Sequence, residues 1–151
     1  MACTSSATTE NPNFLTVPFV WSENGEAHEL DPYAESLAIL GAARRTAVVR
    51  ERHPIPDVGT CSPEAMRAIL DAIDQHHEAG RVVYVHCWGG IGRTGMTVGC
   101  WLVRHWLAPA EALARVNDGF RSIPKLARMP GRTSPDTSAQ TQVVLRWRAG
   151  L

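Results

Sequence analysis

Residues 82–97 read VVYVHCWGGIGRTGMT, and this stretch decides how the rest of the chain is interpreted. The β-branched run at residues 81–86 predicts a strand that is covered on both faces. A glycine-rich turn follows at residues 88–92, and a helix is expected from about Arg93 to Leu107. Such a turn directs successive backbone N–H groups into one concavity at the positive end of a helix dipole. The stretch therefore predicts a site for an anion of phosphate size.

Two side chains in this stretch carry reactive chemistry. Cys87 stands at the C-terminal end of the predicted strand, and Arg93 follows six residues later. The field of the turn stabilises a thiolate and lowers the pKa of the cysteine from its ordinary value of about 8.5. The guanidinium of Arg93 can donate two parallel hydrogen bonds to phosphate oxygens, which a lysine cannot match. We expect the turn to hold a phosphoryl group against a sulfur nucleophile.

The spacing C-x5-R is weak evidence by itself, because the chain contains a second copy. Residues 61–67 read CSPEAMR, with no glycine, an acidic Glu64, and a Pro63 that lacks a backbone N–H. The turn after Cys87 contains three glycines and no acidic residue. The sequence therefore favours the copy at Cys87 as the anion site.

Length and composition limit the possible classes of protein. The chain has 151 residues, with 15 basic and 15 acidic side chains and a formal net charge of zero. We expect a tail at residues 1–13 and a single domain at residues 14–151. A neutral chain offers no electrostatic reason to bind nucleic acid or an acidic membrane as its main partner.

Further composition signals concern metals and location. The four cysteines are scattered, without a CxxC pair or a cluster of zinc-ligand spacing, so neither a metal nor another cofactor is expected. No apolar run reaches the roughly 20 residues that span a bilayer. The N-terminus lacks the features of a signal peptide, and we expect a cytoplasmic protein.

Strands and helices are expected to alternate along the chain. Residues 14–21 (FLTVPFVW) contain an internal proline and predict an edge strand or an extended covering segment. Another strand is expected at residues 46–50. Helices are expected at residues 31–41, from Ser62 to before Gly80, at residues 109–116, and from residues 134–136 onward. This order predicts an α/β fold with a central, mostly parallel sheet flanked by helices.

Three segments resemble the cysteine-dependent protein tyrosine and dual-specificity phosphatases. HCWGGIGRTG (residues 86–95) matches the HCxxGxxR[ST]G signature of that family. HPIPDVGTCSPEAM (residues 53–66) looks like the general-acid loop of its compact dual-specificity members. SPDTSAQTQVV (residues 134–144) resembles the C-terminal segment of its bacterial members. The resemblance covers about residues 53–147 and implies the phosphatase fold, with a shortened N-terminal part of the sheet.

The resemblance also implies a role for each residue of the site. Cys87 attacks phosphorus to form a phosphocysteine, and Asp57 protonates the leaving group and then activates water. Thr94 donates its hydroxyl to the sulfur, and His86 orients the loop from behind. Gln140 positions the water, with Gln142 as the less favoured alternative. The phosphate is held by Arg93 and by the backbone of Trp88, Gly89, Gly90, Ile91 and Gly92, with Trp88 a candidate pocket wall.

The implied substrate is phosphotyrosine in a protein or peptide, with phosphoserine and phosphothreonine as further substrates. Loops that bind polyanions often contain lysine, but residues 88–92 have none, and Lys125 is the one lysine of the chain. A phosphoinositide or small-molecule phosphatase and a weakly active phosphate-binding module remain as alternatives. Asp57 and the Arg93–Thr94 pair argue against a rhodanese-type sulfurtransferase. One hypothesis concerns Cys61, which could form a protective disulfide with Cys87 when the acid loop closes.

Overall fold

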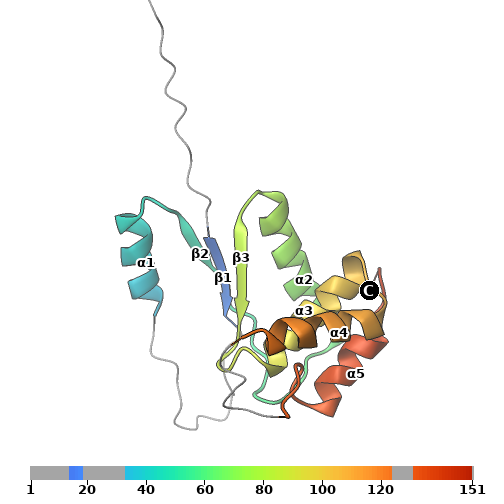
Figure 1. Cartoon of the computed structure of the whole chain (residues 1–151). Coiled ribbons are helices and arrows are strands. Elements are labelled where there is room, and N and C mark those ends of the chain that lie inside the picture. The colour runs from blue at the N-terminus through green and yellow to red at the C-terminus, as the bar shows by residue number, and fades with distance from the viewer. Residues whose placement is uncertain (1–13, 19–32, 124–130, 151) are drawn as a thin grey trace, which may run out of the picture.

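The computed structural model describes residues 14–18, 33–123 and 131–150, so the tail expected at residues 1–13 lies outside the described residues. The described residues are mostly helical, with three short strands (Figure 1). In chain order the elements are β1 (Phe14–Pro18), α1 (Ala34–Ala43), β2 (Val48–Arg50), α2 (Pro63–Glu78), β3 (Val82–His86), α3 (Gly92–His105), α4 (Pro109–Arg121) and α5 (Ser138–Arg146).

The three strands run parallel in the order β2-β1-β3. β1 pairs with β3 along its whole length, with Phe14 opposite Val82 and Pro18 opposite His86. The prediction of an edge strand for this segment is therefore wrong, because β1 is the middle strand. Pro18 is tolerated there because it is the last residue of the strand, where the hydrogen-bonded ladder ends.

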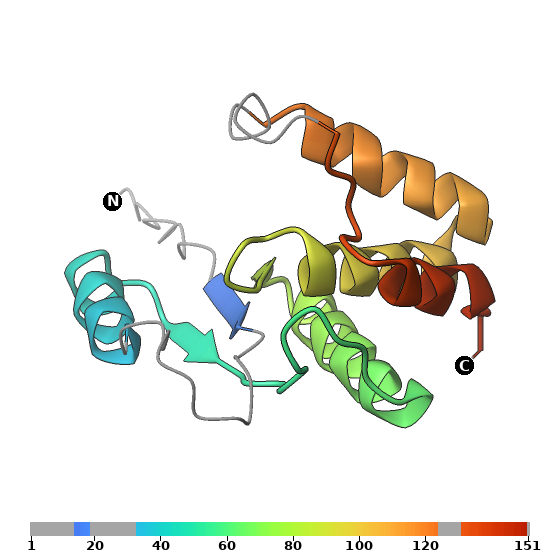
Figure 2. The ribbon, with the colours of Figure 1, turned by 90° about the horizontal axis from the view of Figure 1, so that it is seen from below.

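The helices lie on both sides of the strands. Figures 1 and 2 show α1 on one side, while α2, α3 and α5 lie on the other. The main core forms on the side of α2, α3 and α5, where Leu70, Met96 and Val144 are fully buried. α3 packs against α2, α4, α5 and β3, so the helix that follows the glycine-rich turn lies at the centre of this layer.

One face of β3 is less covered than expected. Val83 and Val85 pack against the core, whereas Val82 and Tyr84, which alternate with them, are exposed. The prediction that this strand is covered on both faces is therefore wrong. The physical reason is the placement of α1, which packs against β2 and buries only its Gly41.

Most helix positions agree with the sequence, although several ends differ. The Ser62 side chain accepts a hydrogen bond from the Ala65 N–H at 3.2 Å, which confirms the predicted cap of α2. α5 begins at Ser138 rather than at residues 134–136, because the Thr137 side chain supplies its N-cap. α4 continues to Arg121, beyond the expected end. None of the described helices has the length and apolar character needed to cross a bilayer.

Candidate active site

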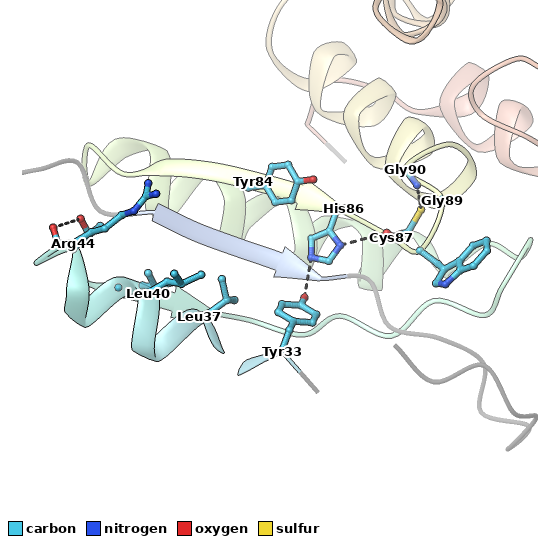
Figure 3. A pocket seen from close by; sticks show the side chains of 13 residues that line it. Tyr33, Leu37, Leu40, Arg44, Tyr84, His86, Cys87, Gly89 and Gly90 are labelled. Atoms are coloured by element: carbon cyan, nitrogen blue, oxygen red, sulfur yellow. Dashed lines mark hydrogen bonds between the residues drawn. The ribbon is translucent and has the colours of Figure 1, made fainter. Parts of the chain in front are cut away.

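The turn between β3 and α3 wraps around the sulfur of Cys87. Gly90 has a φ of +70°, a left-handed conformation that glycine adopts without steric cost. This conformation turns the Gly90 N–H toward Cys87, and it donates a hydrogen bond to Sγ at 3.2 Å (Figure 3). The turn predicted from the glycines therefore directs a backbone donor at the predicted nucleophile.

The environment of Cys87 favours its thiolate. Burial raises the pKa of the Cys87 thiol, but the side-chain hydroxyl and backbone N–H of Thr94, the Gly90 N–H and the charge of Arg93 outweigh it. The net pKa of Cys87 lies below the ordinary value of a free cysteine. Thr94 Oγ1 is buried and forms no other hydrogen bond among the described residues, so its hydroxyl is not engaged away from the thiolate whose pKa it lowers.

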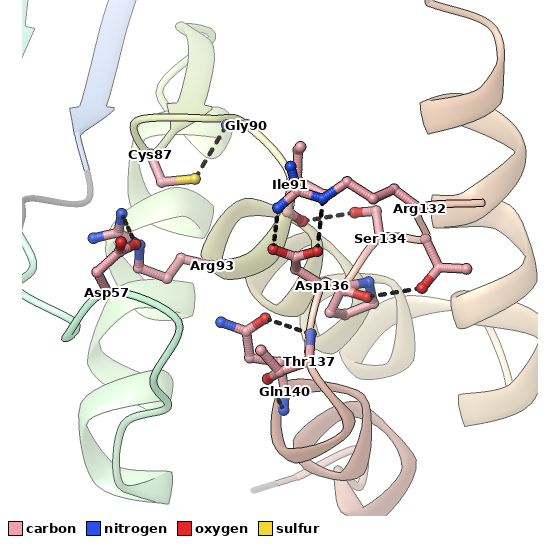
Figure 4. Close-up of polar contacts among 12 residues, drawn as sticks. Asp57, Cys87, Gly90, Ile91, Arg93, Arg132, Ser134, Asp136, Thr137 and Gln140 are labelled. Atoms are coloured by element: carbon pink, nitrogen blue, oxygen red, sulfur yellow. Dashed lines mark hydrogen bonds and ion pairs between the residues drawn. The ribbon is translucent and has the colours of Figure 1, made fainter. Parts of the chain in front are cut away.

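Arg93 joins the turn to the loop that carries Asp57. The buried guanidinium donates from Nη1 to the Ile55 carbonyl at 3.2 Å and from Nη2 to Asp57 Oδ1 at 2.7 Å (Figure 4). The Asp57 side chain is 63% exposed at the mouth of the site. Arg93 thus connects the turn of Cys87 with the carboxylate of Asp57, although these two residues are 30 positions apart in sequence.

A small cavity of about 150 Å³ brings together most of the predicted residues, although His86, Gly90 and Thr94 do not line it. Its lining includes Asp57, Cys87, Arg93 and Gln140, together with Trp88, Gly89, Ile91 and Gly92 of the turn. Thr94 lies on the first turn of α3, and Trp88 is exposed at the rim. No group of three or more His, Cys, Asp or Glu side chains suited to a metal occurs in the described part of the chain.

Gln140 joins the acid loop to α5. Its Nε2 donates to the Gly59 carbonyl at 2.9 Å, and its Oε1 accepts the Thr137 N–H at 3.2 Å. The side chain is fully buried against the turn, since a Cβ at Gly92 would lie 2.7 Å from Gln140 Oε1. Both ends of the amide are therefore engaged within the protein. Gln142, the alternative considered from the sequence, is exposed.

His86 forms hydrogen bonds with the backbone of the turn and with the segment before α1. Its Nδ1 donates to the Cys87 carbonyl at 3.3 Å, because a carbonyl oxygen can only accept. Its Nε2 then accepts the Tyr33 hydroxyl at 2.8 Å. Tyr33, just before α1, had no signal in the sequence, because 53 residues separate it from His86.

The segment before α5 also forms a hydrogen bond with the turn. Ser134 Oγ donates to the Ile91 carbonyl at 2.7 Å, and the Ser134 N–H donates to the Asn117 side chain at 2.9 Å. At the rim, Arg132 Nε donates to Asp136 Oδ1 at 3.0 Å. The sequence SPDTSAQ contained Ser134 and Asp136, but sequence reasoning assigned neither a contact with the site.

The other described cysteines differ from Cys87 in reactivity. Cys61 and Cys100 are free thiols. Burial raises the pKa of Cys61, and burial together with the nearby Cys61 raises the pKa of Cys100 to about 12. Among the described cysteines, Cys87 has the one thiol whose pKa is lowered. The disulfide hypothesis for Cys61 and Cys87 stays a prediction.

Comparisons with known proteins identify related sequences and folds. The family described as "Polymorphic toxin system, DSP-PTPase phosphatase" matches residues 31–106. Cyclin-dependent kinase inhibitor 3 of Rattus norvegicus is 27% identical over 82 residues, which are 53% of this chain and 39% of that protein. This chain therefore spans about two fifths of the length of that curated relative.

Solved structures share the fold over most of the chain. Tk-PTP in its active form is 26% identical with a TM-score of 0.55, and the match covers 87% of this chain and 75% of Tk-PTP. PTPMT1 in complex with PI(5)P is 16% identical with a TM-score of 0.58, covering 89% of this chain and 76% of PTPMT1. These likenesses confirm the expected dual-specificity phosphatase fold.

Proposed function

Because the chain belongs to the DSP-PTPase phosphatases of polymorphic toxin systems, we propose that it removes phosphate from phosphotyrosine, and from phosphoserine or phosphothreonine, in protein substrates. The proposed intermediate is a phosphocysteine at Cys87. One observation carries this proposal: a cysteine of lowered pKa and a buried arginine line the same small cavity.

In the proposed first step, the thiolate of Cys87 attacks phosphorus. The sulfur–phosphorus bond forms as the bond to the leaving oxygen breaks, and Asp57 gives its proton to that oxygen. Arg93 and the N–H groups of the turn stabilise the charge on the equatorial oxygens. A bound phosphoryl group competes with the Asp57 carboxylate for the guanidinium. The displaced carboxylate takes up a proton from solvent and, as the carboxylic acid, approaches the leaving group.

In the proposed second step, water attacks the phosphocysteine. Asp57, now a carboxylate, takes a proton from the water, and the bond between sulfur and phosphorus breaks. The departing thiolate regains the hydrogen bonds from Gly90 and Thr94 that lower its pKa. Inorganic phosphate is the product, and no metal takes part, so we expect EDTA to leave the activity unchanged.

Gln140 has a positioning role in this proposal. The resemblance implies that this glutamine orients the hydrolytic water, but its amide already contacts Gly59 and Thr137. These contacts support a role in holding the acid loop, which carries Asp57 two residues before Gly59. Gln140 would then act on the water through the position of Asp57.

Protein substrates are proposed because residues 88–92 of the turn contain no lysine to bind further phosphates. A phosphoinositide is the second candidate, since PTPMT1 shares the fold and its crystal structure contains PI(5)P. Values of kcat/KM for phosphotyrosine peptide, phosphothreonine peptide and PI(5)P, measured side by side, decide between the classes. We also propose that residues 14–151 form one domain that acts in the cytoplasm.

The enzyme proposal is tested with para-nitrophenyl phosphate. We expect the wild type to hydrolyse it, Cys87→Ser to be inactive, and Asp57→Asn to be slower by about 10²–10⁴. Equal rates for all three proteins would contradict the proposal and would favour a phosphate-binding module without catalytic activity.

A further inference from the structure

A larger cavity of about 810 Å³ begins at Cys87 and extends across the strands to α1 (Figure 3). Leu37 and Leu40 of α1 form one wall, and Val48 and Tyr84 of the strands form part of the floor. At the catalytic end the lining includes Cys87, Trp88, Gly89 and Gly90. We refer to this cavity as the α1 groove.

The α1 groove exposes several large apolar and aromatic side chains. α1 approaches β2 closely at Gly41, where a Cβ would lie 2.8 Å from the Thr46 carbonyl oxygen. Elsewhere the helix stands away from the strands, and Leu40 remains 56% exposed. Tyr84 and Trp88 are also exposed. Exposed apolar surface gathered in a concave site is typical of a binding surface.

The α1 groove adjoins the small cavity that holds Arg93. Cys87, Trp88 and Gly89 line both cavities. A substrate whose phosphoryl group lies beside Arg93 therefore places its neighbouring residues next to the groove. Trp88, at the boundary, belongs to the aromatic residue types that contribute most to binding at interfaces.

We propose that the α1 groove binds bulky apolar residues that flank the phosphorylated residue of a protein substrate. This inference rests on the proposed function and specifies its substrate. Among the described lining residues none is acidic, and Arg44 is the one Lys or Arg. Recognition of a lipid headgroup surface generally uses clusters of about 4–8 basic residues. The chemistry of the lining therefore favours an apolar peptide segment over a membrane lipid.

The chain offers a matched pair of variants to test this inference. Leu40 lines the groove, whereas its neighbour Ile39 is 62% exposed and is absent from the lining. Leu40→Ser and Ile39→Ser thus remove similar apolar side chains from the same exposed helix. Leu37→Ser, from the same wall, is the second groove variant.

The experiment compares two phosphotyrosine peptides, one flanked by leucines and one by serines. For the wild type we expect kcat/KM to be about tenfold higher with leucines, the effect of burying roughly one large apolar side chain. Leu40→Ser and Leu37→Ser should lose most of this preference, and Ile39→Ser should keep it. Para-nitrophenyl phosphate, which is too small to reach α1, should be hydrolysed equally by all four proteins.

Several results would overturn the inference. The inference fails if the wild type shows no preference for the leucine-flanked peptide. It also fails if Leu40→Ser keeps this preference, or if Ile39→Ser loses it to the same extent. A lipid chain would be assigned to the groove if Leu40→Ser no longer distinguished PI(5)P from its soluble headgroup in kcat/KM while its preference between the two peptides was unchanged. A concentration-dependent dimer that Leu40→Ser dissociates would assign it to a second copy.

Failure of the proposed function gives a different pattern. In that case the wild type does not hydrolyse para-nitrophenyl phosphate, whatever the groove binds. The inference is then decided by the affinities of the two peptides, measured by fluorescence anisotropy. These are compared between Cys87→Ser and a double variant that carries both Cys87→Ser and Leu40→Ser. Tighter binding of the leucine-flanked peptide that depends on Leu40 supports the inference, and equal affinities overturn it.

Discussion

Asp57 Oδ1 lies 2.7 Å from Nη2 of Arg93, so the guanidinium that lines the cavity of the reactive cysteine is bound to the carboxylate of the acid loop. Nη1 of the same arginine holds the Ile55 carbonyl of that loop at 3.2 Å. The free protein thus has an internal anion where the proposed substrate places its phosphoryl oxygens. Binding of substrate and release of the proposed general acid are coupled through one side chain.

Asp57→Asn is expected to change catalysis and phosphate binding in opposite directions. The rate with phosphotyrosine should fall by about 10²–10⁴, because the leaving oxygen loses its proton donor. Inorganic phosphate should bind up to about fivefold more tightly, because Arg93 no longer has to release a partly exposed carboxylate. Steady-state kinetics with phosphate as competitive inhibitor measure both effects. An unchanged or weaker inhibition by phosphate would show that the ion pair does not compete.

Thr94→Ala is expected to shift the alkylation profile of Cys87 to higher pH. The Thr94 hydroxyl stabilises the thiolate, so its removal is expected to raise the pKa of Cys87. Less of the thiol is then ionised at a given pH. Iodoacetamide labelling across a pH series, followed by peptide mapping, measures the midpoint at Cys87 alone. Thr94→Ser retains a hydroxyl and serves as the control. A midpoint that is the same in Thr94→Ala and wild type would exclude this contact.

Gln140→Ala is expected to reduce both stability and turnover. Loss of the buried amide leaves the Gly59 carbonyl and the Thr137 N–H without their partner, at a cost of about 1–3 kcal/mol per group left unsatisfied. Thermal unfolding and kcat measure the two effects. Gln142→Ala, at an exposed position on the same helix, should change neither.

The fall in kcat distinguishes two roles for Gln140. If it positions Asp57, turnover should fall more for alkyl phosphates, whose leaving groups depend more strongly on protonation, than for para-nitrophenyl phosphate. An equal fall for both substrates would instead point to a role in the water step alone.

Gly90→Ala is expected to remove activity beyond its effect on stability. A Cβ at φ +70° costs about 1–2 kcal/mol in the left-handed region, and relief of this strain turns the Gly90 N–H away from the sulfur. Gly80, with a φ of +73° and no atom within 4 Å of an added Cβ, offers the same strain far from the turn. Gly80→Ala should therefore lose similar stability by thermal unfolding but retain kcat. Similar kcat values for the two variants would contradict the role of this N–H.

The turn around Cys87 could be predicted from sequence because its determinants are local. The strand, the glycines and the following helix occupy one short segment, and their order alone places the backbone donors near the sulfur. The cap of α2 is similarly local, since Ser62 and Pro63 act within one turn. In both places the hydrogen-bonded residues are three positions apart.

The contacts that organise the site were not predictable, because they join distant segments. Periodicity could not show that β1 is the middle strand, since its pairing partners are separated from it by dozens of residues. The exposed face of β3 depends on where α1 packs. The contact of Gln140 with Gly59 spans 81 positions, and no local pattern specifies it.

The most direct test of the account is a search for phosphate on Cys87 during turnover. The wild type is mixed with a phosphotyrosine peptide, quenched with acid within the first turnovers, digested and examined by mass spectrometry. The account predicts a phosphorylated peptide that contains residue 87, absent from Cys87→Ser and from a sample quenched before substrate is added. Turnover of the peptide without phosphate on Cys87 at any quench time would contradict the account.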